Sequence, residues 1–298
     1  MSALAAVLIA NPNEPVVDAA LVMKAAQVVQ GAEVRMLDGG VAAEFIVEGE
    51  SDRRALRRRL LGAIERAPVD VAVVAVEGRR KRLLIADMDS TMIEQECLDE
   101  LAAGLGLKDK VAAITERAMR GEIEFEPALR ERVALLKGLP AAETIADVLD
   151  HRITLTPGGL ALVATMRANG AYAALVSGGF TAFTEVVAAK LGFDENRANL
   201  LEIEADLLAG RVVEPILGRD AKLAALNDLI KAKGLDRADT LAVGDGANDL
   251  AMLGGAGLGV AYRAKPAVAE AAHVRIDHGD LSALLYLQGY TSDEIVSG

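Results

Sequence analysis

The chain has 298 residues, 52% of them hydrophobic and 26% charged, close to the average of globular proteins. This composition excludes an intrinsically disordered chain, a collagen and a coiled coil, and the length predicts roughly two domains. The 44 acidic and 32 basic residues give a net charge of −12, the wrong sign for neutralising nucleic-acid phosphates or anionic lipids. We therefore expect neither nucleic acid nor a membrane as a partner.

The first residues, MSALAAVLIANPNEP, have no basic segment before their apolar stretch, so they predict a first strand and not a secretory signal. Apolar stretches elsewhere are interrupted by Asp, Arg or Gly before they reach the length of a membrane span. Cys97 is the only cysteine, so no intrachain disulfide can form. These features fit a cytoplasmic protein.

The first 80 residues predict a βαββαβ unit. We expect strands at 3–10, 33–39, 41–49 and 69–78, and helices at 16–30 and 51–67. Gly39 and Gly40 indicate a tight hairpin between the second and third strands. This order of elements is the split βαβ arrangement of ferredoxin-like modules.

A basic cluster, Gly78-Arg79-Arg80-Lys81-Arg82, separates this unit from the next apolar run. It could be a nucleic-acid patch, but in an acidic chain without nearby aromatic residues a solvated linker is the better interpretation. We therefore divide the chain into residues 1–80 and 81–298. A solvated linker also predicts that the second part folds and acts without the first.

From residue 83 onward, predicted strands alternate with predicted helices, which indicates an open, mostly parallel sheet covered on both faces. The expected strands are 83–89, 171–179, 198–205, 240–246 and 257–262. Residues 94–155 interrupt this alternation with several helical patterns and no strand, so we expect a helical insertion there. Residues 207–215 predict a small hairpin around Ala209 and Gly210.

Ligands of open α/β sheets bind beyond the carboxyl ends of the strands, so the residues that end each apolar run are the informative ones. Three runs end in acids, hydroxyls or glycines: Asp87 and Asp89, then Ser177, Gly178 and Gly179, then Asp245 and Asp249. The carboxylates would repel one another without a cation, and oxygen ligands favour Mg²⁺. A metal beside glycine-rich turns suggests phosphoryl transfer, with Lys222 as a fixed positive charge.

Four motifs occur in this order: Asp87-Met88-Asp89-Ser90-Thr91, Ser177-Gly178-Gly179-Phe180, Lys222, and Gly244-Asp245-Gly246-Ala247-Asn248-Asp249. Together they resemble the haloacid dehalogenase superfamily and, within it, the phosphoserine phosphatase family, over residues 83–285. The resemblance implies a Rossmann-like α/β core whose helical insertion is a cap. The N-terminal unit resembles an ACT-like domain.

The resemblance implies hydrolysis of O-phosphoserine to serine and phosphate, the last step of serine biosynthesis. In this scheme Asp87 attacks phosphorus, and Asp89 protonates the leaving hydroxyl and then activates water. Mg²⁺ is held by Asp87, the carbonyl of Asp89 and Asp245, with Asp249 helping through water.

The resemblance also assigns the parts of the substrate. The phosphate oxygens are held by Ser177, the Gly178 amide, Lys222 and Asn248. In the cap, Glu96 and Arg132 match the positions that bind the serine ammonium and carboxylate, and Met119 and Phe125 match apolar lid positions. A carboxylate and a bidentate guanidinium suit a zwitterion, although Glu and Arg are plentiful in this segment.

Two other interpretations stay open. The substrate could be another small phosphomonoester, such as phosphohomoserine or phosphoethanolamine. The chain could also be a non-catalytic amino-acid sensor, although the presence of Asp87, Asp89, Lys222 and Asp245 together argues against a decayed site. For the N-terminal unit, the ACT-like resemblance implies an amino-acid effector or a homodimer, and the alternative is a packed structural appendage.

Overall fold

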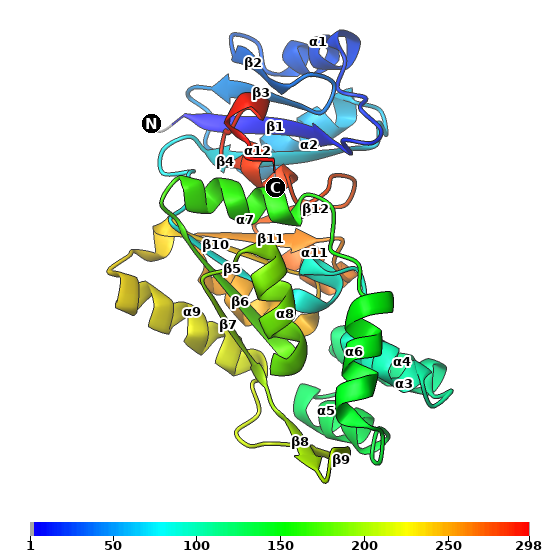
Figure 1. The fold of residues 1–298 in the computed structure, drawn as a ribbon. Coiled ribbons are helices and arrows are strands. Elements are labelled where there is room, and N and C mark those ends of the chain that lie inside the picture. The colour runs from blue at the N-terminus through cyan, green and yellow to red at the C-terminus, as the bar shows by residue number, and fades with distance from the viewer. Residues whose placement is uncertain (1–2, 298) are drawn as a thin grey trace.

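The structure, a computed structural model, describes residues 3–297 (Figure 1). Its N-terminal part is a four-stranded antiparallel sheet of order β2-β3-β1-β4. The elements are β1 (Leu4–Ala10), α1 (Ala19–Val28), β2 (Glu33–Asp38), β3 (Ala42–Val47), α2 (Arg53–Ala63) and β4 (Val69–Ala75). The predicted βαββαβ order is confirmed.

The central strand β1 of this N-terminal sheet is buried on both faces. Ala6 and Leu8 of β1 belong to an apolar cluster with α1 and α2, whereas Ala5, Val7 and Ile9 belong to the large cluster of the following part of the chain. A strand buried on both sides reads as a continuous apolar run, as residues 4–10 do.

The second sheet has six parallel strands in the order β12-β11-β10-β5-β6-β7. These are β5 (Leu83–Ala86), β6 (Tyr172–Phe180), β7 (Glu195–Asn199), β10 (Thr240–Gly244), β11 (Leu258–Tyr262) and β12 (Val274–Ile276). The predicted Rossmann-like α/β core is confirmed. The carboxyl ends of β5, β6 and β10 are neighbours, so the three predicted strand ends meet at one sheet edge.

Helices cover both faces of this parallel sheet. One apolar cluster packs α7 (Gly159–Ala168) and α8 (Thr181–Leu191) on one face, and another packs α9 (Arg219–Lys233) and α10 (Leu250–Gly255) on the other. Two shorter helices follow, α11 (Pro266–Ala271) and α12 (Ala283–Leu287). Within residues 3–297, no helix combines the length and apolarity that crossing a bilayer requires.

The predicted insertion is helical, with α3 (Cys97–Ala103), α4 (Lys108–Met119), α5 (Phe125–Ala134) and α6 (Ala141–His151). We call residues 94–155 the cap. A hairpin of β8 (Leu201–Glu204) and β9 (Leu207–Val212) lies beside α5 (Figure 1). The Gly138 N–H donates to the Leu208 carbonyl at 2.8 Å, so the hairpin is part of the same lobe.

Two sequence predictions were wrong here. Residues 198–205 are not one buried strand, because β7 ends at Asn199 and β8 belongs to the separate hairpin, where Ile203 is 51% exposed. The hairpin also does not turn at Ala209-Gly210, since 207–212 is a single strand. The chain reverses at Ala205 and Asp206, which both have positive φ.

The basic cluster at 78–82 is not a solvated linker. Arg79 forms an ion pair with Glu44, whose side chain is fully buried in the N-terminal sheet. Arg80 pairs with Glu294 at 2.7 Å and lies over the Tyr290 ring. These contacts hold the cluster against both the N-terminal sheet and the C-terminal segment.

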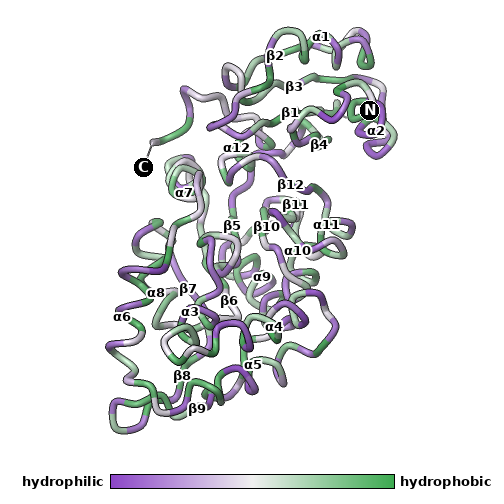
Figure 2. Tube along the Cα trace, turned by 90° about the vertical axis from the view of Figure 1, so that its right-hand side faces the viewer, coloured by the Kyte–Doolittle hydropathy of each residue, from purple (hydrophilic) through white to green (hydrophobic). Residues whose placement is uncertain are grey.

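Further contacts join the two sheets. Asp70 of β4 accepts hydrogen bonds from the backbone N–H groups of Asp277, His278 and Gly279. The helix α12 lies between the N-terminal sheet and the parallel-sheet part, as Figures 1 and 2 both show. The prediction that the second part folds independently was based in part on a solvated linker, and the shared core removes that part of its basis.

Candidate active site

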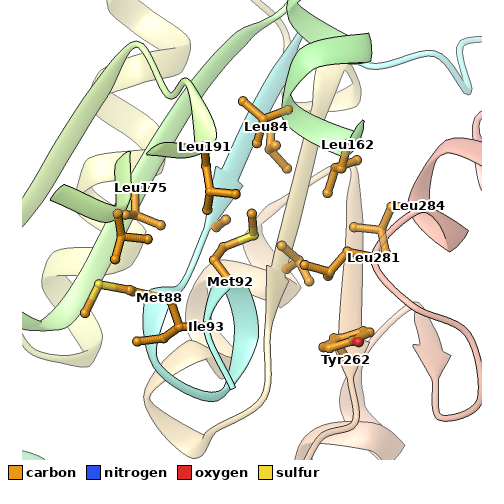
Figure 3. Close-up of a cluster of buried hydrophobic side chains, with 14 of the residues drawn as sticks. Leu84, Met88, Met92, Ile93, Leu162, Leu175, Leu191, Tyr262, Leu281 and Leu284 are labelled. Atoms are coloured by element: carbon orange, nitrogen blue, oxygen red, sulfur yellow. The ribbon is translucent and has the colours of Figure 1, made fainter. Parts of the chain in front are cut away.

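The first acidic pair lies in the turn that follows β5. The Asp87 N–H donates to the Val243 carbonyl of the adjacent strand at 3.0 Å, which fixes the start of the turn. Met88 and Met92 are fully buried in the core beneath it (Figure 3). Ser90 has a φ of 54°, an unusual conformation for a non-glycine residue that tightens the turn. The core thus anchors the turn through its methionines.

Lys222 is the centre of a buried charge network. Its Nζ lies 2.7 Å from Oδ1 of Asp87 and 2.7 Å from Oδ1 of Asp249, and its side chain is fully buried. Asp87 Oδ1 also accepts from the Met88 N–H at 2.8 Å. Among the described residues, no hydrogen bond goes to Asp87 Oδ2, so this oxygen is available for chemistry.

Three buried carboxylates, Asp87, Asp245 and Asp249, each offer an oxygen within 4.8 Å of the others. Burial and the carboxylates of Asp249 and Asp87 raise the pKa of Asp245 well above its usual range. Burial and Asp87 also raise the pKa of Asp249, to about 7, against the opposing effect of Lys222. One ammonium does not balance three buried carboxylates, so the cluster is suited to a divalent cation.

The last residues of β6, where its pairing with β7 shifts register between Val176 and Phe180, form a turn that makes another wall of the site. Ser177 is buried, and its Oγ accepts from the Gly179 N–H at 2.8 Å. Asn199 holds this turn from behind, donating through Nδ2 to the Gly178 carbonyl at 2.9 Å and accepting from the Leu217 N–H at 2.6 Å. The phosphate-type loop is therefore positioned by a buried amide at the end of β7.

The cap closes directly onto the glycines of the sheet edge. A Cβ on Gly178 would lie 2.6 Å from the Phe125 ring, and one on Gly246 would lie 2.5 Å from the Met119 sulfur. Only glycine allows this approach of cap to core. The cavity beneath has a volume of about 30 Å³, room for water but not for an amino-acid phosphate, so entry of a larger molecule requires movement of the cap or its side chains.

Glu96 and Asp89 form the acidic side of this cavity. Ser90 Oγ donates to Glu96 Oε1 at 2.6 Å, and the Cys97 N–H donates to Asp89 Oδ1 at 3.1 Å. Burial, opposed by the hydrogen bonds from Cys97 and reinforced by Asp87, raises the pKa of Asp89 to about 6. Burial and the Asp89 carboxylate raise the pKa of Glu96 well above its usual range. A cationic ligand group would relieve this repulsion.

Arg132 also lines the cavity, and the hydrogen bonds that it forms with the described residues all lie within the cap. Its Nε donates to the Ala128 carbonyl at 3.1 Å, and its Nη1 donates to Thr115 Oγ1 at 2.9 Å. Thr115 in turn donates to Asp99 Oδ1 at 2.7 Å. All three polar side chains of this chain of hydrogen bonds are buried. The guanidinium is therefore aimed by a relay from α3 through α4 to α5.

The family model of the haloacid dehalogenase-like hydrolases matches residues 84–254, more than half of the chain. The chain belongs to this family. This haloacid dehalogenase-like hydrolase is 43% identical over 256 residues to the phosphoserine phosphatase of Streptomyces coelicolor. That match covers 85% of the chain and 62% of the relative, so the chain spans less than two thirds of the relative's length.

Two solved structures are also similar to this hydrolase. One, titled a phospho-aspartyl intermediate analogue of phosphoserine phosphatase, is 39% identical with a TM-score of 0.67, covering 70% of this chain and 98% of that one. The other is a haloacid dehalogenase family hydrolase from Salmonella enterica serovar Typhi, 30% identical with a TM-score of 0.83, covering 99% and 100% of the two chains. The second likeness extends over the N-terminal sheet as well.

The predicted residues of this hydrolase lie together. Most of the predicted site residues line the cavity: Asp87, Asp89, Glu96, Met119, Phe125, Arg132, Ser177, Gly178 and Asn248. Lys222, Asp245 and Asp249 are not among the lining residues, but they lie beside Asp87. The Oδ1 atom of Asn248 is buried and has no hydrogen-bond partner among the described residues.

Sequence reasoning missed three polar residues of the site. Thr91 donates to Asp245 Oδ1 at 3.1 Å, Asn199 holds the Gly178 turn, and Thr115 holds Arg132. Thr91 is the last residue of the first motif, so its position gave a signal although the sequence assigned it no role. Asn199 and Thr115 resemble ordinary polar residues of a strand and a helix, and nothing in the sequence pattern distinguishes them.

Proposed function

We propose that this hydrolase converts O-phosphoserine to serine and phosphate. The observation that carries the proposal is one cavity lined by two chemically different sets of residues, Ser177 and Gly178, which suit a phosphate, and Glu96 and Arg132, which suit a zwitterion. Relatives named phosphoserine phosphatase support it.

We propose Mg²⁺ as the cofactor, held by Asp87, Asp245 and Asp249 with the Asp89 carbonyl. The fit rests on the donor set, which is all oxygen, buried and short of positive charge, since Lys222 supplies a single ammonium. When bound, the cation would neutralise charge on the phosphoryl group and on the carboxylates.

In the proposed reaction, the free Oδ2 of Asp87 attacks phosphorus and the bond between phosphorus and the serine oxygen breaks. Asp89, with a pKa of about 6, is protonated in a fraction of molecules near neutral pH and gives its proton to the departing oxygen. The Asp89 carboxylate then accepts a proton from the water that hydrolyses the aspartyl phosphate. Lys222 contacts the Oδ1 atom of Asp87 and leaves its Oδ2 atom free, so it can hold the carboxylate in place throughout the reaction.

The remaining proposed roles concern substrate binding. Ser177, the Gly178 N–H, Lys222 and Asn248 would hold the phosphate oxygens, and the unpartnered Asn248 Oδ1 marks a side chain with unused hydrogen-bonding capacity. Glu96 would accept the ammonium and Arg132 would bind the carboxylate through paired N–H donors. Met119 and Phe125 would exclude water when the cap is closed.

We also propose that residues 1–80 form a regulatory or dimerisation domain for the catalytic part, residues 81–298. The ferredoxin-like topology supports this proposal, with an amino acid as effector or a homodimer as the assembly. Serine inhibition beyond product competition, or a dimer by light scattering, is the expected result. Purely competitive inhibition of a monomer would contradict both ideas.

The activity is tested by phosphate release from O-phosphoserine, phosphohomoserine and phosphoethanolamine, each with and without Mg²⁺. We expect O-phosphoserine to have the highest kcat/KM and turnover to require the metal. Arg132→Ala should lower kcat/KM for O-phosphoserine about 10 to 100-fold, the range for a lost charge-assisted hydrogen bond. Phosphoethanolamine, which lacks a carboxylate, is the matched control. Preference for another ester, or equal losses on both substrates, would overturn the assignment.

A further inference from the structure

A second, larger cavity lies between the N-terminal sheet and the catalytic part. One wall is formed by α2 and β4, and the other by α11 and β12; Figure 2 shows these four elements along the same side of the molecule. The cavity has a volume of about 880 Å³, within the range of small-molecule sites. We call it the arginine groove, after its lining residues Arg53, Arg54, Arg57, Arg58 and Arg275.

Arg275 on the opposite wall pairs with Asp277, and Glu270 also lines the groove, so the charge left without a partner is that of α2. Among the described residues, no carboxylate lies within 4.0 Å of the four arginines of α2 that line the groove. Arg59, on the same helix but outside the groove, does pair with Glu50 at 2.8 Å. In a chain with a net charge of −12, such a concentration of unpaired guanidinium groups requires a specific explanation.

The groove holds part of this charge in a fixed position. Arg57 is half-buried, and its Nε donates to the Val71 carbonyl at 2.7 Å. Its Nη1 and Nη2 donors form no hydrogen bond with the described residues, so they are available to a ligand. Burial, and then the charge of Arg275 on the opposite wall, lower the pKa of Arg57, against the opposing effect of the Asp277 and Asp70 carboxylates. Arg57 and Arg275 line the groove from different elements, and an anion between them would add to the compensation that these carboxylates provide.

The geometry indicates what kind of anion fits. Arg53 and Arg57, like Arg54 and Arg58, are one helical turn apart, about 5 to 6 Å, and Arg275 faces them from β12. The lining guanidinium groups are thus distributed over more than one helical turn and the opposite wall, an arrangement that suits a chain of linked phosphates better than a single phosphate. The groove also lies at Gly257 and Leu258, where β11 begins, whereas the candidate active site lies where the strands end.

We propose that the arginine groove binds a small molecule with two or more linked phosphate groups, at a site separate from the candidate active site. Planar guanidinium groups bind phosphate oxygens in pairs, and α2 presents four of them that form no ion pair among the described residues. The edge strand β4 forms part of the same wall. The inference does not depend on the identity of the hydrolysed substrate.

Isothermal titration calorimetry on the full chain tests this proposal, with inorganic tripolyphosphate and ATP as the two probes. We expect saturable binding of one molecule per chain. Equal affinities would assign the ligand to the bare phosphate chain, and tighter binding of ATP would assign it to nucleoside polyphosphates. The double variant Arg53→Gln/Arg57→Gln should bind at least about tenfold more weakly, because charge-assisted hydrogen bonds are lost.

Arg59→Gln is the matched control, since it removes the same kind of charge from the same helix outside the groove. It should bind like the wild type, and the groove variants should release phosphate from O-phosphoserine at the wild-type rate. The exposed Arg54→Gln repeats the test if the double variant does not fold. Absence of saturable binding, or equal binding by groove and control variants, would overturn the proposal.

Discussion

Replacing Thr115 by valine should change the substrate preference of this hydrolase, although Thr115 does not line the cavity and acts only through Arg132. Valine has nearly the same shape as threonine but removes the hydroxyl that accepts from Arg132 at 2.9 Å and donates to Asp99 at 2.7 Å. Thr115 is buried, so water does not replace the lost partner. Arg132 then keeps only the Nε bond to the Ala128 carbonyl at 3.1 Å and can rotate about it.

The size of the effect follows from these bonds. A hydrogen bond to a charged group contributes about 1.5 to 3 kcal/mol, and the remaining bond to Ala128 places the loss at the lower end. Since about 1.4 kcal/mol corresponds to tenfold, kcat/KM for O-phosphoserine should fall about tenfold. The unpaired Asp99 carboxyl should also lower stability by about 1 to 3 kcal/mol, because burial already raises its pKa and Thr115 opposes that shift.

The assay compares kcat/KM for O-phosphoserine and phosphoethanolamine in the wild type, Thr115→Val and Thr115→Ser. Serine keeps the hydroxyl, so it should retain activity to within about twofold on both substrates. For Thr115→Val, the loss should be confined to O-phosphoserine, whose carboxylate is the proposed partner of Arg132. An equal loss on both substrates, or an equal loss in Thr115→Ser, would refute the reasoning and assign the residue a purely structural role.

Three other outcomes are expected. Asp87→Asn should fold normally by circular dichroism and lose turnover by several orders of magnitude, with no phosphoenzyme in single-turnover assays, because the nucleophile is gone. A chain beginning at Gly78 should be insoluble or unfold at a lower temperature than the full chain, since it lacks the Asp70 carboxylate that accepts three backbone N–H groups; an equal midpoint in thermal denaturation would contradict this. The Gly259 N–H donates to His273 Nδ1 at 2.8 Å and burial lowers the pKa of His273, so this stabilising contribution is present above the unfolded pKa of about 6.5 and is lost as the pH falls below it. Urea denaturation between about pH 7.5 and about pH 5 should show the wild type losing about 1 kcal/mol more than His273→Asn, which keeps an acceptor that does not titrate; identical pH profiles would contradict the assignment.

The sequence predicted the parallel core because buried strands such as β5 and β10 are short apolar runs that end in acids. It failed at the edge of the sheet. Residues 195–197 of β7 are polar and only partly buried, as an edge strand allows, so the apolar residues that follow them suggested a strand in the wrong place. The hairpin turn was missed because Ala205 and Asp206 adopt positive φ without glycine.

The sequence could predict those residues of the candidate site that lie at or near the carboxyl ends of strands. Asp87, Ser177 and Asp245 stand at fixed places in the chain relative to apolar runs, and the fold brings those places together. The positioning residues Thr115 and Asn199 could not be predicted, because their partners lie in other elements and depend on packing. The pairing of Arg79 with Glu44 was hidden for the same reason.

The attachment of the cap lobe restricts how it can move. Two pairs of chain segments connect it to the core, one at Ile93 and Leu155, which form a β-bridge, and one where the Val213 N–H donates to the Leu200 carbonyl. A lobe that is joined to the core by two such connections can rotate about the line between them, but it resists rotation about other axes. Asn199, next to the second connection, also holds the Gly178 turn. An opening of the lobe at this second connection would therefore act on the Gly178 turn through Asn199, which would couple access to the cavity with the shape of the phosphate-type loop.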